Sequence, residues 1–282
     1  MTTDPGVITA LYYYPIKSCR GTALDEGTIA ARGFVEDRAW MVTDANGIFQ
    51  TQREMPRMAL IAPRAEGDGL VLTAPGMPSL PVARRAEGAR RDVAVWASVC
   101  ATVDQGPEPA AWLSAFLGAP CRLVRMADDF VRHTDPEYSI GLDDQVGFAD
   151  GYPFLLTVES SLADLNSRMT VPLPMNRFRP NIVVRGPAAY AEDSWQRIRI
   201  GGVPFSVVKS CARCPITTVD QATAETTMEP LRTLATYRHV RGRGVMFGQN
   251  LIHGARGTIR LGDPVEIVQL AMAGNGAHQT RG

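Results

Sequence analysis

The sequence has no excess of charge of either sign. Its 282 residues include 29 basic and 29 acidic side chains, and its pI is near 6.9. Proteins that bind nucleic acids or anionic membrane surfaces through bulk charge carry clustered positive charge. The balance argues against both functions, and we expect neither a nucleic-acid partner nor a membrane partner.

Long apolar runs are absent as well. No window supplies the roughly 18 uninterrupted apolar residues that a membrane-spanning helix needs. The first 15 residues lack the basic segment followed by an apolar segment that marks a secretory signal. The five cysteines are an odd number scattered along the chain, which does not suit a disulfide scaffold. These features predict a cytoplasmic protein.

Lysine is also scarce, since only Lys17 and Lys209 occur among the 29 basic residues. Chemistry that requires a lysine amine therefore has two possible sites. The apolar fraction of 45% and the charged fraction of 21% are typical of a soluble globular protein. The length allows one large domain or two modest ones.

Short β-branched and aromatic segments dominate the chain. They recur between clusters of Gly, Pro, Asn and Asp about every 8 to 12 residues, a spacing typical of barrels and sandwiches. One such strand is expected at Met58–Ala62, in a hairpin with Leu70–Thr73. We predict a mainly β (α+β) protein, built as a barrel or sandwich, with a few short helices.

The periodicity of apolar residues predicts few helices. We expect them at Glu108–Leu117, Ser160–Met169 and Pro230–Tyr237. Gly118 should end the first helix. In the second, Ser161 and Asp164 have a spacing similar to that of a capping box.

One polar stretch is the best linker candidate. It covers residues 127–144 and contains Asp135-Pro136 and Gly141. We therefore expect an N-terminal domain over residues 1–126, a second domain over 127–270, and a flexible tail over 271–282.

The densest chemical signal is Cys211-Ala212-Arg213-Cys214-Pro215, which follows an apolar strand. Two thiols three residues apart occur in redox dithiols, in zinc sites, and where one thiolate binds a metal held mainly by another group. The chain offers no second ligand pair at zinc spacing, and β-branched residues follow where a thioredoxin motif needs a helix. A single thiolate ligand fits better, with Arg213 favouring the ionised sulfur. Two incidental cysteines are the alternative.

Two further segments combine cations with anion-binding groups. The turn after the first strand holds Lys17 and Ser18, and Asn176–Asn181 holds Arg177 and Arg179. Each could bind an anion such as phosphate. Taken alone, the Lys17 turn is better explained as a solvated turn, and the Asn176–Asn181 segment could equally be a solvated loop.

Two other enzyme classes are disfavoured. Gly242, Gly244 and Gly248 have the wrong spacing for a dinucleotide fingerprint, and no G-x-S-x-G elbow indicates a serine hydrolase.

Taken together, these segments resemble the molybdenum-cofactor sulfurase C-terminal (MOSC) superfamily. The resemblance is to the branch with an N-terminal MOSC β-barrel, which includes the mitochondrial amidoxime-reducing components and bacterial relatives. The matching stretches follow the family's order over nearly the whole chain. They are Leu11–Gly21, Arg32–Trp40, Thr51–Arg57, Phe148–Pro153, Ser161–Ser167, Asn176–Asn181, Tyr190–Trp195, Cys211–Asp220 and Gly262–Val265.

The resemblance implies a molybdenum cofactor, Mo-molybdopterin, lodged between two β-rich domains. In the family, the pterin dithiolene, oxygen ligands and one protein cysteine hold the metal. That cysteine corresponds to Cys214, which is the implied metal ligand and a catalytic residue. A soft thiolate suits a metal that is already bound by sulfur.

The other implied cofactor contacts are cations and one loop. Lys17, Ser18 and Arg38 match positions that bind the pterin and its phosphate, and Arg179 matches a further contact. Asp150-Gly151-Tyr152 matches a segment beside the cofactor and the metal. We expect Gly151 and Tyr152 to bind cofactor and Asp150 to be catalytic. Together with Cys214, these residues make up the expected site.

The implied activity is reduction of N-hydroxylated compounds: hydroxylamines, amidoximes and N-hydroxylated bases. Because no cysteine follows Cys214, we expect no plant-type ferredoxin module of the kind some bacterial relatives carry. A separate flavoprotein, ferredoxin or cytochrome b5-like protein would supply electrons. The alternative is a carrier of the cofactor, or of a persulfide on Cys214 or Cys211, without turnover. Pyridoxal phosphate chemistry is disfavoured, since that fold needs a longer chain.

Overall fold

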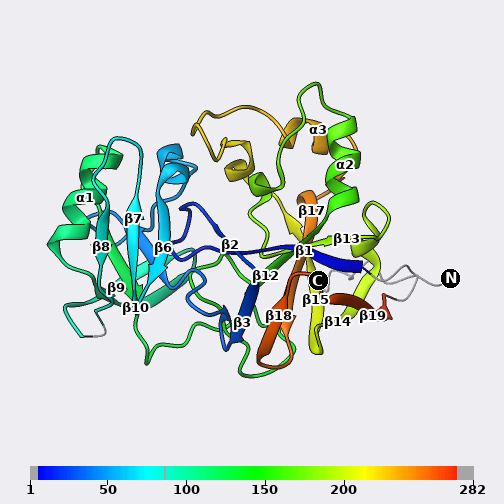
Figure 1. The fold of residues 1–282 in the computed structure, drawn as a ribbon, viewed down its shortest axis with the longest axis horizontal. Helices are drawn as coiled ribbons and strands as arrows, with labels where there is room; N and C mark the ends of the chain where they lie inside the picture. Colours follow the sequence, from blue (N-terminus) through cyan, green and yellow to red (C-terminus); the bar gives the residue numbers. More distant parts are fainter. Residues whose placement is uncertain (1–5, 86, 272–282) are drawn as a thin grey trace.

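The computed structural model describes residues 6–85 and 87–271, and strands dominate it (Figure 1). Seven strands close into a barrel in the order β12-β13-β1-β19-β14-β15-β17, with β17 returning to pair with β12. They are β1 (Gly6–Tyr13), β12 (Phe154–Val158), β13 (Ile182–Arg185), β14 (Trp195–Ile200), β15 (Val203–Ala212), β17 (Gly244–His253) and β19 (Pro264–Leu270). The prediction of a mainly β protein is confirmed.

Apolar side chains from every part of the barrel fill its core. Leu11, Ile182 and Leu251 are fully buried there. Phe154 packs edge-on against Phe205, with ring centroids 5.5 Å apart. Such edge-to-face pairs add to the free energy gained from burial.

Strands from the start of the chain are part of this barrel or pair with it. β1 lies between β13 and β19, and β2 (Thr22–Leu24) pairs with β1. β3 (Glu26–Ala30) pairs with β18 (Gly257–Arg260) and with β4 (Gly33–Phe34). The short β16 (His239–Val240) pairs with β17. The domain boundary between residues 126 and 127 stays a prediction.

The other end of the molecule, on the left in Figure 1, holds two smaller sheets. One has the order β5-β11-β10-β9 and the other β6-β7-β8. Their strands are β5 (Trp40–Thr43), β6 (Ala62–Glu66), β7 (Gly69–Thr73), β8 (Leu80–Val82), β9 (Arg90–Val95), β10 (Ser98–Asp104) and β11 (Arg122–Met126). Trp112 and Phe116 of helix α1 (Pro107–Leu117) join their apolar core. As expected, α1 ends at Gly118, whose φ of 76° is left-handed.

The strand expected at Met58–Ala62 is wrong. The 3-10 helix η1 (Pro56–Leu60) occupies most of that stretch, and β6 begins only at Ala62. Pro56 has a φ suited to a helical first turn. The buried Met58 and Ala59 produce an apolar run that resembles a strand.

The two other helices are shorter than expected, and one cap is wrong. They are α2 (Glu159–Ser167) and α3 (Leu231–Ala235). Ser161 lies inside α2, where its hydroxyl donates to the carboxylate of Glu192 instead of capping the helix. Within the part of the chain that the structure describes, no helix is long and apolar enough to cross a membrane. Of the expected tail, residues 272–282 lie outside the described residues.

Glu192 is a carboxyl group buried at one end of the barrel. It is 0% exposed, and its oxygens lie 2.8 and 3.0 Å from the Ser161 hydroxyl. Burial raises the pKa of Glu192 to about 7, although the bond from Ser161 opposes this change.

We expect Glu192 to make the free energy of unfolding fall as pH rises. Its folded pKa of about 7 lies above its ordinary value of 4.5. The stabilisation is therefore fully present below pH 4.5 and is lost as pH rises through 7. The difference between the two pKa values corresponds to roughly 3 kcal/mol of unfolding free energy. Urea unfolding at a series of pH values should show this slope and a flatter one in Glu192→Gln, which cannot ionise. Equal slopes would contradict the assignment.

Candidate functional site

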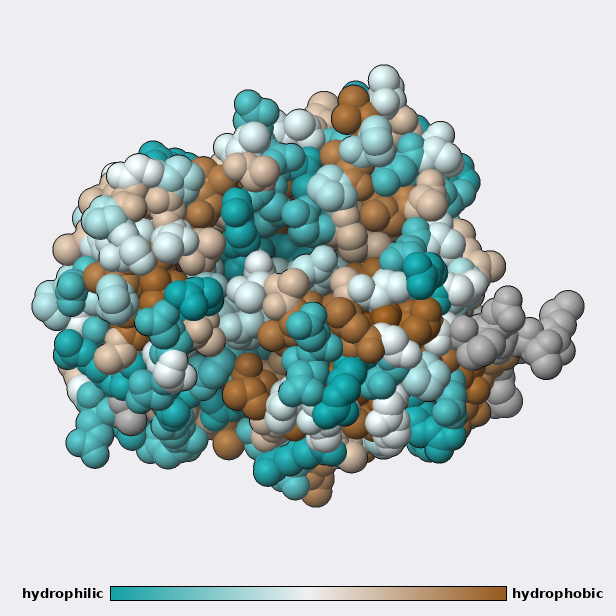
Figure 2. All heavy atoms as spheres, in the orientation of Figure 1, coloured by the Kyte–Doolittle hydropathy of each residue, from teal (hydrophilic) through white to brown (hydrophobic). Residues whose placement is uncertain are grey.

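The surface is hollowed between the part of the molecule that contains the barrel and the part that contains the two smaller sheets. Hydrophilic residues line this hollow on the face shown in Figure 2. A cavity of about 680 Å³, its open mouth included, contains every residue of the expected site in its lining. These residues are Lys17, Ser18, Arg38, Asp150, Gly151, Tyr152, Arg179 and Cys214. What each residue does there stays a prediction.

Three of the lining residues have left-handed backbone. The φ angles of Ser18, Arg38 and Arg179 are 64°, 47° and 55°. Residues other than glycine seldom adopt this conformation, which costs about 1–3 kcal/mol and is concentrated at functional sites. The surrounding hydrogen bonds hold it in place; for example, the Arg38 N–H donates to the Tyr14 carbonyl at 2.7 Å.

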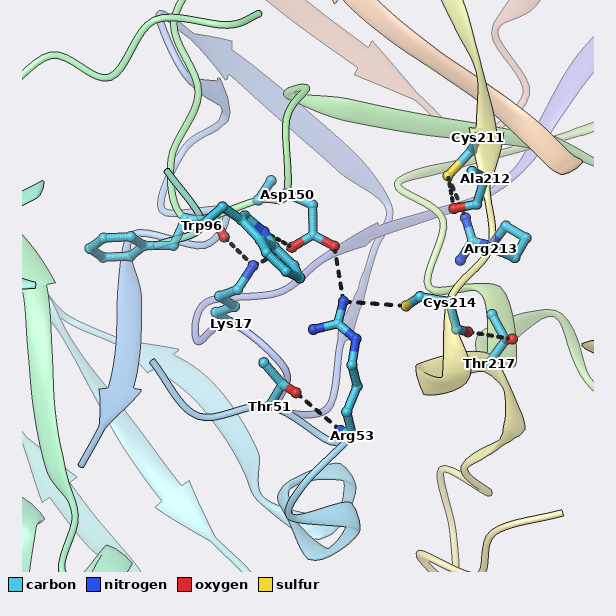
Figure 3. Close-up of polar contacts among 12 residues, drawn as sticks. Lys17, Thr51, Arg53, Trp96, Asp150, Cys211, Ala212, Arg213, Cys214 and Thr217 are labelled. Atoms are coloured by element: carbon cyan, nitrogen blue, oxygen red, sulfur yellow. Dashed lines mark hydrogen bonds and ion pairs between the residues drawn. The ribbon is translucent and has the colours of Figure 1, made fainter. Parts of the chain in front are cut away.

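Lys17 and Asp150, which both line the cavity, form an ion pair (Figure 3). The Lys17 amine donates to Asp150 Oδ1 at 2.5 Å and to the Phe148 carbonyl at 2.8 Å. Trp96 Nε1 donates to the same carboxylate oxygen at 3.2 Å. The surrounding protein opposes ionisation by displacing solvent around the carboxylate, but Lys17 and Trp96 hold the pKa of Asp150 well below its usual range. Asp150 is therefore an anion that accepts hydrogen bonds and cannot supply a proton near neutral pH.

Arg53 joins this pair to Cys214. Cys214 directly precedes the 3-10 helix η4 (Pro215–Thr218). Arg53 Nη2 donates to Cys214 Sγ at 3.4 Å and lies 3.7 Å from Asp150 Oδ2 (Figure 3). The sulfur of Cys214 therefore has a cationic hydrogen-bond donor beside it. The sequence analysis missed Arg53 as a site residue, although Thr51–Arg57 is one of the matching stretches.

Arg213 was expected beside the metal-binding thiolate, but it lies beside Cys211. It bonds to the sulfur of Cys211 (Nη1 to Sγ, 2.8 Å) and to the Phe178 carbonyl (2.7 Å). Residues two apart on an extended segment point to the same side, which pairs position 211 with position 213. The guanidinium beside Cys214 comes instead from Arg53.

A cluster of two guanidiniums occupies another part of the wall. Arg38 and Arg179 lie over the ring of Tyr14, at 4.2 and 4.3 Å from its centroid. Asp37, 4% exposed, accepts a hydrogen bond from Arg38 at 2.6 Å and from the Tyr14 N–H at 2.7 Å. One carboxylate therefore faces two guanidiniums, and the surplus positive charge suits an anionic ligand.

Two buried polar atoms of the lining have no hydrogen-bond partner among the described residues. They are the hydroxyl of Tyr152 and Nε of Arg213. Buried polar groups are nearly always bonded, and these two atoms are exceptions. In the same described part of the chain, no cluster of three His, Cys, Asp or Glu residues could hold a metal. A metal bound here would need most of its ligands from another molecule.

Comparison with known proteins matches both parts of the chain. The family described as the MOSC N-terminal beta barrel domain matches residues 5–120, and the MOSC domain matches residues 143–266. The chain is 36% identical over 281 residues to mitochondrial amidoxime-reducing component 1 of Homo sapiens, covering 93% of this chain and 83% of that protein. Identity is 37% to the component 1 of Mus musculus (93% and 82% covered). It is 35% to component 2 of Bos taurus (92% and 82% covered).

Proposed function

This chain belongs to the MOSC family, in the branch of the mitochondrial amidoxime-reducing components, and on that basis we propose that it is a molybdenum-dependent oxidoreductase. Its substrates are N-hydroxylated compounds, which it reduces to the corresponding amines, amidines or bases. The names of the relatives support the amidoxime class directly. Their names also place them in mitochondria, so the cytoplasmic location of this chain stays a prediction.

The observation that carries the proposal is that the eight residues implied by the resemblance line one cavity. They come from segments as far apart as Lys17 and Cys214. The cavity offers surplus positive charge and thiols, and the described residues provide no complete set of metal ligands. This donor set fits a metal that arrives already bound by an anionic, sulfur-containing cofactor.

In this proposal Cys214 gives one thiolate to molybdenum. Lys17, Ser18, Arg38 and Arg179 hold the pterin and its phosphate. Gly151 and Tyr152 complete the wall beside the metal. When bound, the cofactor supplies a two-electron redox centre that accepts the oxygen of the substrate.

The protein's own residues control charge and protons around that centre. Arg53 places a positively charged hydrogen-bond donor beside the sulfur of Cys214. Lys17 carries a proton on Nζ, hydrogen-bonded to Asp150 Oδ1. Burial lowers the pKa of Lys17 although Asp150 opposes this change, so Nζ releases a proton more readily than an exposed lysine. Reduction of an N-hydroxyl group consumes two electrons and two protons and forms water.

Electrons come, in this proposal, from a separate protein. The three buried cysteines, Cys19, Cys100 and Cys121, are free thiols that stand apart in the sequence. An iron–sulfur cluster would need four grouped thiolates. A flavoprotein, ferredoxin or cytochrome b5-like protein is the proposed donor.

Metal analysis combined with pterin fluorescence of the purified chain tests the proposal. We expect molybdenum and pterin in equal amounts, and reduction of benzamidoxime to benzamidine with a reduced viologen dye as donor. Absence of both metal and pterin would reject the function. Cofactor without turnover, or a persulfide on Cys214 found by mass spectrometry without metal, would favour the carrier.

A further inference from the structure

A second cavity adjoins the first beside Asp150. It measures about 1110 Å³, its open mouth included, and shares Asp150, Gly151, Tyr152, Cys211 and Asn250 with the first cavity. Trp96 and Lys209 line it but do not line the first. None of the cofactor contacts at Lys17, Ser18, Arg38 or Arg179 lies in its wall. A molecule in this cavity would therefore lie beside Asp150, next to the cavity that contains Cys214 and clear of these four cofactor contacts.

Trp96 occupies an unusual position in the wall of this second cavity. It is the first residue of the two-residue turn that joins β9 to β10, since Val95 pairs with Ser98 across the hairpin. Its φ is 53°, a value that such turns normally assign to Gly, Asn or Asp. A bulky residue there costs conformational energy that the hairpin does not require. Backbone strain of this kind points to a function for the side chain.

The exposure of Trp96 also sets it apart from the other tryptophans. Trp40, Trp112 and Trp195 are 1%, 6% and 3% exposed, whereas Trp96 is 50% exposed. Its indole lies against Phe49, with ring centroids 5.1 Å apart, and under the guanidinium of Arg53 at 4.8 Å. Its N–H is fixed on Asp150. The contacts on Arg53, Asp150 and Phe49 hold the ring in place while half of the residue remains accessible.

Asp150 is the polar partner of this aromatic surface. Oδ1 accepts from both Lys17 and Trp96. Oδ2 has only the 3.7 Å ion pair with Arg53 among the described residues, and the side chain is 56% exposed. Oδ2 can therefore accept an N–H bond from a ligand that lies against the indole.

We propose that the second cavity is the substrate-entry subsite and that Trp96, with Asp150 Oδ2, selects substrates with a flat conjugated group beside the reacting nitrogen. Aromatic amidoximes and N-hydroxylated bases meet this requirement, because they carry a planar ring and a neighbouring N–H donor. Hydroxylamine itself carries no ring. The selection among substrates during turnover rests on the proposed function. Binding of a flat ligand at Trp96 does not depend on it.

The kinetic test compares two substrates in cofactor-loaded protein. In Trp96→Ala, KM for benzamidoxime divided by KM for hydroxylamine should rise about fivefold, since one aromatic contact is lost. Trp96→Phe keeps a ring and should change the ratio less than the alanine variant does. Val99→Ala is the matched control, because Val99 is 65% exposed on the same hairpin and lies outside the lining of both cavities. An unchanged ratio in Trp96→Ala would overturn the inference and leave the proposed function intact.

The binding test does not depend on turnover. Benzamidine, the planar product, should change the emission of the one exposed tryptophan in the purified protein, and this change should be absent in Trp96→Phe. Acetamidine, which has no ring, should bind more weakly. If benzamidine binds the wild type and Trp96→Ala equally well, the subsite is wrong. If it binds at Trp96 in a protein that reduces nothing, the subsite stands and the proposed function fails.

Discussion

Replacing Cys214 by serine should abolish reduction of benzamidoxime in protein loaded with cofactor. The substitution removes the one thiolate that the proposal gives to the metal, and a serine hydroxyl is a harder and far less acidic ligand. The cationic anchors for the pterin are unchanged, so pterin should still be retained. Turnover with a reduced viologen dye, with molybdenum and pterin measured on the same sample, checks this result.

Cys211→Ser is the matched control for that experiment. The two thiols are three residues apart, but the sulfur of Cys211 bonds to Arg213 while that of Cys214 bonds to Arg53. We expect Cys211→Ser to keep its metal and to retain turnover. A Cys214→Ser protein that folds, holds molybdenum and turns over at the wild-type rate would remove Cys214 from the mechanism.

The strands show which elements local sequence patterns can predict and which they cannot. Strand β7 was predicted over Leu70–Thr73, because a run of apolar and β-branched residues marks it. β17, which closes the barrel, was missed because Gly244 and Gly248 interrupt its pattern. A Cβ on Gly248 would lie 2.7 Å from the carbonyl oxygen of Leu156 in β12. Gly248 belongs to the glycine pattern that does not match a nucleotide-binding motif. Because it has no side chain, the two barrel strands β12 and β17 can approach closely.

The site shows a different limit. Its eight predicted residues came from the resemblance to a family, while spacing and periodicity alone left each motif open. Arg53 and Trp96 were missed because their importance depends on contacts across the fold. Arg53 meets a sulfur 161 positions away, and Trp96 meets Asp150 54 positions away. Local patterns carry no information on such contacts.

Asp37→Asn should strongly destabilise the cofactor-free protein. The carboxylate is buried and bonds to Arg38, and Asn181 Nδ2 donates to it at 3.3 Å. Burial raises the pKa of Asp37 although Arg38 opposes this change. Asparagine avoids the cost of burying a charge, but it leaves Arg38 and Arg179 close together without a counter-ion. We expect the second effect to be larger and the loss to be about 3 kcal/mol, typical of a buried pair that loses one partner.

The same argument predicts that the cofactor offsets part of this loss. The phosphate that we place near Arg38 would restore negative charge, so loading should raise the unfolding free energy more in Asp37→Asn than in the wild type. Urea unfolding with and without cofactor measures both increments, with Asp68→Asn in the exposed turn before β7 as the control. Equal increments in the two proteins would place the phosphate elsewhere. A loss below about 1 kcal/mol would show that Asp37 is not the counter-ion that holds the two guanidiniums together.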